Sequence, residues 1–333
     1  MVVRRDALAL WAGVLFSFAF TGLIWLAGER LEAIPKLPDE GASWYYWKLP
    51  EPTLWSRATA WGGYAAHQLA LWGLIVYAQR RVRRYTTGLH RVNLVALAVN
   101  AGFAVLHFVQ THVWYDGLAQ DVSIFSSQGS VVLLLVWVLL MENDRRGLFF
   151  GRRAPFAREL VRFARRYHGY VFAWAAVYTF WYHPMENTSG HLIGFVYMFF
   201  LLLQGSLFFT RAHLNRWWTF TLEAIVLVHG TLVAVMQGNG LWPMFALGFA
   251  GLIVVTQMHG LGLGRGPKWL AVAAYAAATA LIYNWRGWAR IDEVVRIPVI
   301  EYASVFVLAG LLWVGLRIAS VTRVRARAAG AAT

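Results

Sequence analysis

The chain has 333 residues, of which 59% are apolar and 14% are charged, and it contains no cysteine. Soluble domains average about 45–50% apolar and about 25% charged residues, so this composition excludes an ordinary soluble fold. The lack of cysteine excludes disulfides, cysteine-bound iron–sulfur clusters and cysteine nucleophiles. Any metal would have to be held by histidine, carboxylate, methionine or tyrosine.

The apolar residues gather in runs of about 20, the length of a helix that crosses a bilayer. Ten runs predict an all-α, multi-pass transmembrane helix bundle of about ten helices, which forms a single integral membrane domain over residues 1–333. In chain order the runs cover roughly 7–27, 58–78, 92–114, 129–143, 168–184, 190–210, 216–237, 242–259, 268–285 and 298–318.

Two polar segments between the runs have distinctive patterns. Residues 28–57 are expected to form an extracytoplasmic loop on the membrane surface, anchored by the interfacial aromatic residues Trp44, Tyr45, Tyr46 and Trp47. Residues 152–167 place apolar side chains at helical spacing and arginines around the rest of the helix. This pattern predicts an amphipathic helix lying flat on the cytoplasmic surface, or a docking site for a partner membrane subunit.

The basic residues are distributed unevenly between alternate loops. With a cytoplasmic N-terminus, 23 of the 30 lysines and arginines fall on the cytoplasmic side. This positive-inside bias predicts a multi-pass protein of the cell (inner) membrane with both termini in the cytoplasm. The formal net charge of +14 then meets anionic membrane lipids, so no nucleic-acid partner is expected.

Ten histidines are present, and most lie inside or at the ends of the apolar runs. An imidazole in hydrocarbon is costly, so it typically faces the protein interior and has a function. Pro184 disfavours helical geometry at His183, which therefore ends the fifth run, and His191 opens the sixth. The third run is expected to end on the same side of the membrane with His107, His112 and Asp116.

Imidazole nitrogens and carboxylate oxygens are suitable ligands for a transition metal such as Zn, Fe or Cu. The favoured interpretation is a membrane metalloprotein with a site near the extracytoplasmic face. It would be a redox or hydrolytic enzyme acting on a lipid-soluble substrate, either a lipid or a quinone. The expected metal ligands are His107, His112, His183 and His191, and the expected catalytic groups are Glu186, Asp116 and Glu223.

Two alternatives remain open from the sequence. In the first, the protein is an electron-transfer subunit that binds haem b through His67, near the membrane midplane, and His229. In the second, it is a non-catalytic subunit or a proton-coupled transporter, in which the histidines form hydrogen bonds or carry protons. Glu223 then either belongs to a proton path or is a neutral acid hydrogen-bonded to Gln204.

Overall fold

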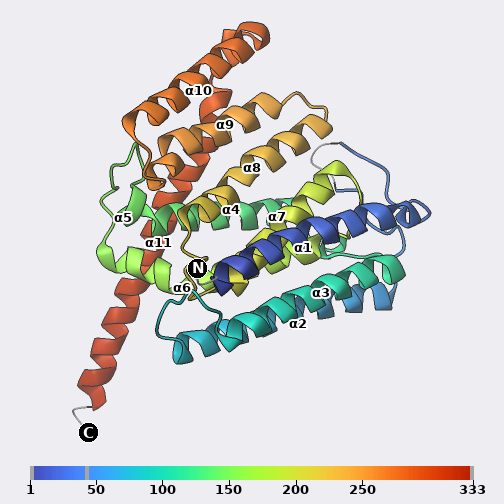
Figure 1. Cartoon of the computed structure of the whole chain (residues 1–333), viewed down its shortest axis with the longest axis horizontal. Coiled ribbons are helices and arrows are strands. Elements are labelled where there is room, and N and C mark those ends of the chain that lie inside the picture. Colours follow the sequence, from blue (N-terminus) through green and yellow to red (C-terminus); the bar gives the residue numbers. More distant parts are fainter. Residues whose placement is uncertain (1–3, 42–44, 331–333) are drawn as a thin grey trace. The chain divides into compact units, whose positions relative to one another are not determined.

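The computed structural model describes residues 4–41 and 45–330, with side chains described as far as residue 322. Within these ranges the chain is all-helical, with 76% of residues in helices and no strand (Figure 1). The predicted interfacial residue Trp44 lies outside the described residues.

The described residues form ten helices of 14 residues or more, and each overlaps one of the predicted apolar runs. Four-residue α5 (Asn143–Arg146) and several 3₁₀ turns lie between them. The long helices are α1 (Arg5–Ala27), α2 (Leu54–Arg81), α3 (Arg91–Trp114), α4 (Ile124–Met141), α6 (Arg158–Tyr182), α7 (Ser189–Ser206), α8 (Arg216–Met236), α9 (Trp242–Val255), α10 (Arg265–Arg286) and α11 (Glu293–Gly330).

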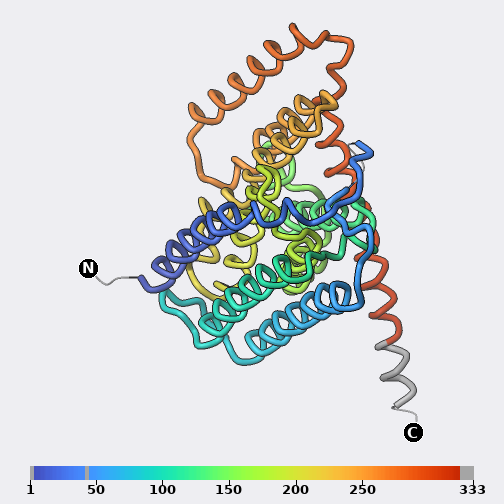
Figure 2. Tube along the Cα trace, turned by 90° about the vertical axis from the view of Figure 1, so that its right-hand side faces the viewer, coloured from blue at the N-terminus to red at the C-terminus, as the bar shows by residue number. Residues whose placement is uncertain are grey.

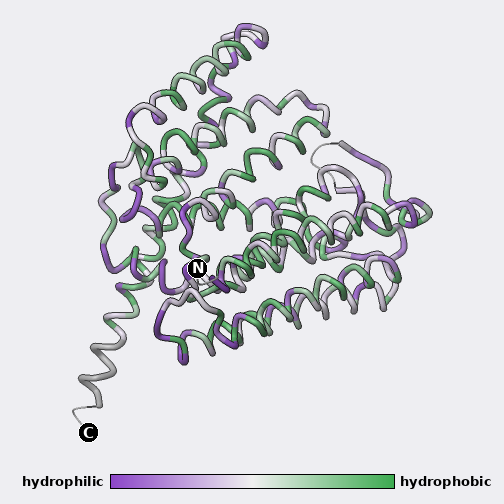
Figure 3. The backbone as a smooth tube through the Cα atoms, viewed as in Figure 1, coloured by the Kyte–Doolittle hydropathy of each residue, from purple (hydrophilic) through white to green (hydrophobic). Residues whose placement is uncertain are grey.

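Seven helical segments in the described ranges are long and apolar enough to cross a membrane; α2, α6 and α10 are not among them. Hydrophilic residues gather at helix ends and in connecting segments (Figure 3). Large apolar side chains such as Trp11 and Leu15 on α1 are 69% and 71% exposed. These features are those of a helical membrane protein, whose outer surface meets lipid. The number of spans and the side on which each terminus lies stay predictions.

The predicted surface helix at 152–167 is not a separate element. Residues 158–167 instead continue directly into the next apolar run as the single helix α6. Pro155 precedes this helix, and no proline interrupts it, so nothing in the sequence forces a break between the arginine-rich and the apolar parts. On the buried face of the arginine-rich part, the carbonyl of Ala164 accepts a hydrogen bond from Trp137 Nε1 at 3.0 Å.

The chain divides into two compact units. Unit 1 comprises Met1–Leu134 and Gly169–Phe249, and unit 2 comprises Leu135–His168 and Ala250–Thr333. The expectation of a single membrane domain over residues 1–333 stays a prediction.

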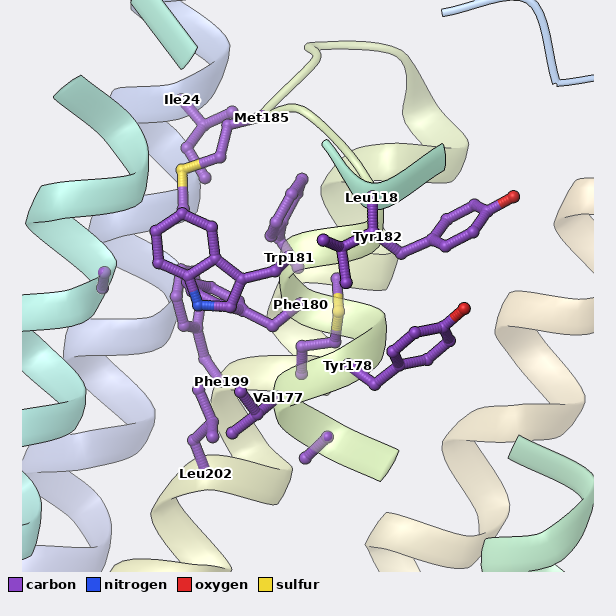
Figure 4. Packing of buried hydrophobic residues seen from close by; sticks show 14 of the residues in the cluster. Ile24, Leu118, Val177, Tyr178, Phe180, Trp181, Tyr182, Met185, Phe199 and Leu202 are labelled. Atoms are coloured by element: carbon purple, nitrogen blue, oxygen red, sulfur yellow. The ribbon is translucent and has the colours of Figure 1, made fainter. Parts of the chain in front are cut away.

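In unit 1, α7 packs against α1, α3 and α8, and α2 packs against α3 (Figure 2). The largest buried cluster centres on the C-terminal half of α6. Trp181 projects from one side of this helix, and Tyr178 and Tyr182 project from the other (Figure 4). One helix therefore supplies side chains to two sides of the core.

Two adjacent glycines on α2 provide a test of this packing. A Cβ atom built on Gly63 would lie 2.2 Å from Trp181 Cη2, whereas nothing lies within 4 Å of a Cβ built on Gly62. We expect Gly63→Ala to destabilise the protein by about 1–3 kcal/mol, because it overpacks a filled core. Gly62→Ala should be neutral or stabilise it by up to about 1 kcal/mol, because alanine has the higher helix propensity. Thermal unfolding in detergent measures both, and equal effects would contradict the packing described.

Candidate functional site

The turn between α6 and α7 is held against the end of α3. His107 on α3 donates a hydrogen bond from Nε2 to the carbonyl oxygen of His183 at 2.9 Å. The backbone N–H of Met185 donates to Thr111 Oγ1 at 3.1 Å. Beyond α3, Gly117 packs so closely on α6 that an added Cβ would lie 2.4 Å from the carbonyl oxygen of Tyr182. The third helix and the turn at 183–188 are therefore neighbours, as the metal-site hypothesis required.

Two of the predicted ligands, His183 and His191, lie together in this region. Their ring centroids are 5.5 Å apart with planes at 80°. Thr188 caps α7 by accepting a hydrogen bond from the backbone N–H of His191, which fixes where this helix begins. The same hydroxyl is 2.8 Å from His191 Nδ1. The sequence pattern thus positions both imidazoles at the ends of adjoining helices.

A third group, the phenol of Tyr45, joins the two imidazoles. Its hydroxyl forms a 3.0 Å hydrogen bond with His191 Nε2, and its ring centroid is 5.0 Å from that of His183. Trp47 packs edge-on against His191 at 4.6 Å. We call His183, His191 and Tyr45 the His–Tyr cluster. Tyr45 is buried, so its predicted place as an interfacial anchor is wrong.

The loop that carries Tyr45 is fixed by backbone contacts. The side-chain amide of Gln120 donates to the carbonyl of Leu49 and accepts from its N–H, both at 3.0 Å. The backbone N–H of Leu37 donates to the carbonyl of Lys48 at 3.1 Å. These bonds hold the segment around Tyr45 over the ends of α6 and α7. No regular sequence pattern marked this placement, because Gln120 lies about 70 residues further along the chain.

The two predicted carboxylates are neutralised by cations. Glu186 forms a 2.6 Å ion pair with Lys36 and accepts a hydrogen bond from Tyr115. Asp116 forms a 2.6 Å ion pair with Arg57. Burial raises the pKa of Asp116, and the hydrogen bond and charge of Arg57 oppose that shift. Both carboxylates thus have a cation as partner, and their predicted catalytic role stays a prediction.

Burial also controls the ionisation of the cluster's phenol. It raises the pKa of Tyr45 well above its ordinary value, and the negative charge of Glu186 raises it further. The phenol therefore keeps its proton unless a positive charge enters the site.

The other predicted ligands on α3 are engaged elsewhere. His107 uses Nε2 for the carbonyl of His183 and Nδ1 for the side-chain amide of Gln110. His112 donates from Nδ1 to the carbonyl of Phe108, one turn earlier on its own helix, at 2.8 Å. The structure therefore does not bring His107 and His112 into one ligand set with His183 and His191.

The two predicted haem ligands have different surroundings. His67 bonds to Asn100 through Nε2 at 2.7 Å and accepts from Trp181 Nε1 at 3.3 Å on Nδ1. Its ring is stacked on Phe103 with centroids 4.3 Å apart. His229 lies against Gly194, where an added Cβ would be 3.4 Å from its Nε2. His67 interacts electrostatically with His107, whereas His229 interacts with His183 and His191.

Glu223 is buried on α8 and interacts electrostatically with Tyr197. The amide of Gln204, its predicted partner, instead donates to the carbonyl of His213 at 3.1 Å and accepts from Trp218 Nε1 at 2.8 Å. The predicted Glu223–Gln204 pair is therefore not the contact that this amide makes. The proton-path role of Glu223 stays a prediction.

Over the described ranges, no group of three or more histidine, aspartate or glutamate side chains is placed to hold a metal ion. The complete His/carboxylate ligand set predicted from the sequence is thus not assembled. No protein-family model, curated protein or solved structure matches the chain.

Sequence reasoning missed Tyr45, Lys36, Tyr115 and Arg57, which surround the predicted residues. One signal was present: Lys36 is one of only three lysines in the chain and lies in the loop that also carries the aromatic residues. The pairing of Lys36 with Glu186 joins residues about 150 positions apart, so no local pattern contains it.

The Lys36–Glu186 pair gives a stability prediction. Lys36→Met leaves a carboxylate side chain that is only 3% exposed without its cation. We expect it to destabilise the protein by up to about 3 kcal/mol, because an unpaired buried charge is costly. Lys36→Met combined with Glu186→Gln should recover most of the loss. The control, Arg296→Met, breaks an ion pair whose partners are 50% and 58% exposed and should cost at most about 1 kcal/mol. Thermal unfolding measures these changes. Equal losses of stability in Lys36→Met and Arg296→Met would show that burial does not make the Lys36–Glu186 pair more important than an exposed one.

Proposed function

We propose that unit 1 binds a transition metal ion through His183, His191 and Tyr45, and that the protein is a membrane enzyme acting on a lipid-soluble substrate at this site. The observation that carries the proposal is the His–Tyr cluster itself. His183 Nδ1 is buried there and has no hydrogen-bond partner among the described residues. Buried polar atoms nearly always have a partner, so an orphaned imidazole nitrogen beside a second imidazole and a phenol points to a missing ligand.

The spacing of the rings supports one shared ion. Imidazole nitrogens bind zinc at about 2.0–2.1 Å, so two rings on one tetrahedral ion have centres about 5 Å apart. The centres of His183 and His191 are 5.5 Å apart. The hydroxyl of Tyr45 is already 3.0 Å from His191 Nε2, where a metal ion would replace the shared proton.

The electrostatics are also suited to a cation. Buried imidazoles in contact with each other stay neutral, and the neutral form is the one that binds metal. Glu186 lies close enough to Tyr45 to raise the pKa of its phenol and would favour a positive ion there, and Lys36, which is paired with Glu186 and acts on His191, offsets part of this effect. A metal ion would reverse the effect of burial on Tyr45, because its charge stabilises the phenolate.

The third ligand indicates which metals are suitable. Protein zinc sites use cysteine, histidine and carboxylate ligands, whereas tyrosine occurs as a ligand of iron. Imidazole is suitable for iron and copper as well as zinc. With carboxylates held by Lys36 and Arg57, the cluster favours Fe or Cu over Zn and redox chemistry over hydrolysis.

The surroundings support a lipid-soluble substrate. Trp47 and the aromatic residues of the core cluster line this end of the helices of unit 1. The positive-inside bias supports an extracytoplasmic position for it, in the cell membrane. A lipid or a quinone reaches such a site without leaving the bilayer.

The two alternatives from the sequence, a haem-binding subunit and a non-catalytic subunit or transporter, differ in what they require of these histidines. Haem at His67 would require that imidazole to give up a hydrogen bond on one of its two nitrogens, as a metal at His191 also would. The observation that favours the His–Tyr cluster is the buried Nδ1 of His183, which has no hydrogen-bond partner among the described residues, whereas both ring nitrogens of His67 have one. A non-catalytic subunit or proton-coupled transporter would hold no metal at the cluster, and it is an outcome of the following test.

Metal analysis of the detergent-purified protein should find Fe or Cu in stoichiometric amount. His183→Ala, His191→Ala and Tyr45→Phe should each remove most of it, because each deletes one ligand. His112→Ala is the matched control: this histidine is also at the end of α3, and its buried Nε2 likewise has no partner within the described chain, but it lies outside the cluster. Full occupancy in both His183→Ala and His191→Ala, or equal loss in His112→Ala, would refute the assignment.

A further inference from the structure

Unit 2 contains an acid that the site in unit 1 does not use. Helix α11 carries two buried glutamates, Glu293 and Glu301, which are 4% and 2% exposed. They are eight residues apart, about 12 Å along the helix axis. Both lie in a segment long and apolar enough to cross a membrane.

The two acids differ in their partners. Glu293 accepts hydrogen bonds from Arg286 at 2.7 and 2.9 Å and from Tyr283 at 3.1 Å. Its charge is therefore compensated by a guanidinium. Within the described part of the chain, Glu301 forms no ion pair, and its Oε2 is buried without a hydrogen-bond partner.

Polar groups lie near Glu301, but among the described residues none forms an ion pair with it. The neighbouring Tyr302 shares a 2.8 Å hydrogen bond with the hydroxyl of Thr256, which in turn donates to the carbonyl of Leu148. Tyr302 also interacts electrostatically with Glu301 and with the buried Arg146 of α5. Among the described side chains, the titratable and charged groups near this acid are thus Tyr302 and, beyond it, Arg146.

An ionised carboxylate in these surroundings would have lost its hydration without gaining a counter-ion, which costs several kcal/mol or more. Protonation removes that cost and gives the acid one O–H donor. We propose that Glu301 is a proton-binding site inside unit 2, occupied by a proton at neutral pH. Buried acids in membrane helices mark proton pathways, so this acid would be a step for a proton crossing unit 2. The proposal does not rest on the function proposed for unit 1.

The test uses dicyclohexylcarbodiimide, an apolar reagent that modifies protonated carboxyl groups. The full-length protein in vesicles is treated at neutral pH, and its peptides are analysed by mass spectrometry. Modification is expected at Glu301 and not at Glu293, because Arg286 keeps the latter ionised. It should decline as the pH is raised, and the modified peptide should be lost in Glu301→Gln but kept in Glu293→Gln.

Infrared spectroscopy of the untreated protein gives a second readout that does not depend on reagent access. The carbonyl band of a protonated carboxylic acid should be diminished in Glu301→Gln and unchanged in Glu293→Gln, with thermal unfolding showing that both variants are folded. Equal modification of both acids independent of pH would overturn the proposal, as would a carbonyl band that Glu301→Gln leaves intact. Protection of Glu301 by sodium ions at constant pH would assign the site to a metal cation instead of a proton.

Discussion

The hydrogen bond from His107 to the carbonyl oxygen of His183 ties helix α3 to the turn between α6 and α7. A second hydrogen bond strengthens this link: Thr111, four residues further along α3, accepts from the backbone N–H of Met185 in the same connection between α6 and α7. With that turn fixed, His183 ends one helix and His191 begins the next, and the loop carrying Tyr45 closes over both. His107 was expected to bind metal, but its contacts make it a residue that positions the cluster.

Charge compensation separates the two kinds of polar group at this end of unit 1. The carboxylates of Glu186 and Asp116 each have a cation within 2.6 Å, whereas the imidazoles and phenol of the cluster have none. The function proposed for unit 1 depends on this difference, because neutral nitrogen and oxygen donors that are not engaged by a cation would be open to a metal ion. The same difference separates Glu293, which is paired with Arg286, from Glu301, for which a bound proton is proposed.

The sequence predicted the helices well because hydrophobic runs and end signals are local. Pro184 after His183 and the start of the next apolar run at His191 mark helix ends within a few residues of where they lie. The sequence did not predict features that depend on contacts between residues far apart in the chain. Arg57 and Lys36 determine the state of Asp116 and Glu186, and neither is near its partner in the chain. Tyr45 has the composition of an interfacial aromatic residue, and only tertiary packing buries it. The arginine-rich segment before residue 168 has the pattern of a surface helix, but its backbone simply continues into α6.

The central claim is that a metal ion is bound by two imidazoles and a phenol in unit 1. The most direct test is the visible absorption spectrum of the purified protein. The account predicts a broad phenolate-to-metal charge-transfer band that disappears in Tyr45→Phe. A spectrum with the sharp bands of haem, or a colourless protein that takes up neither iron nor copper, would contradict it.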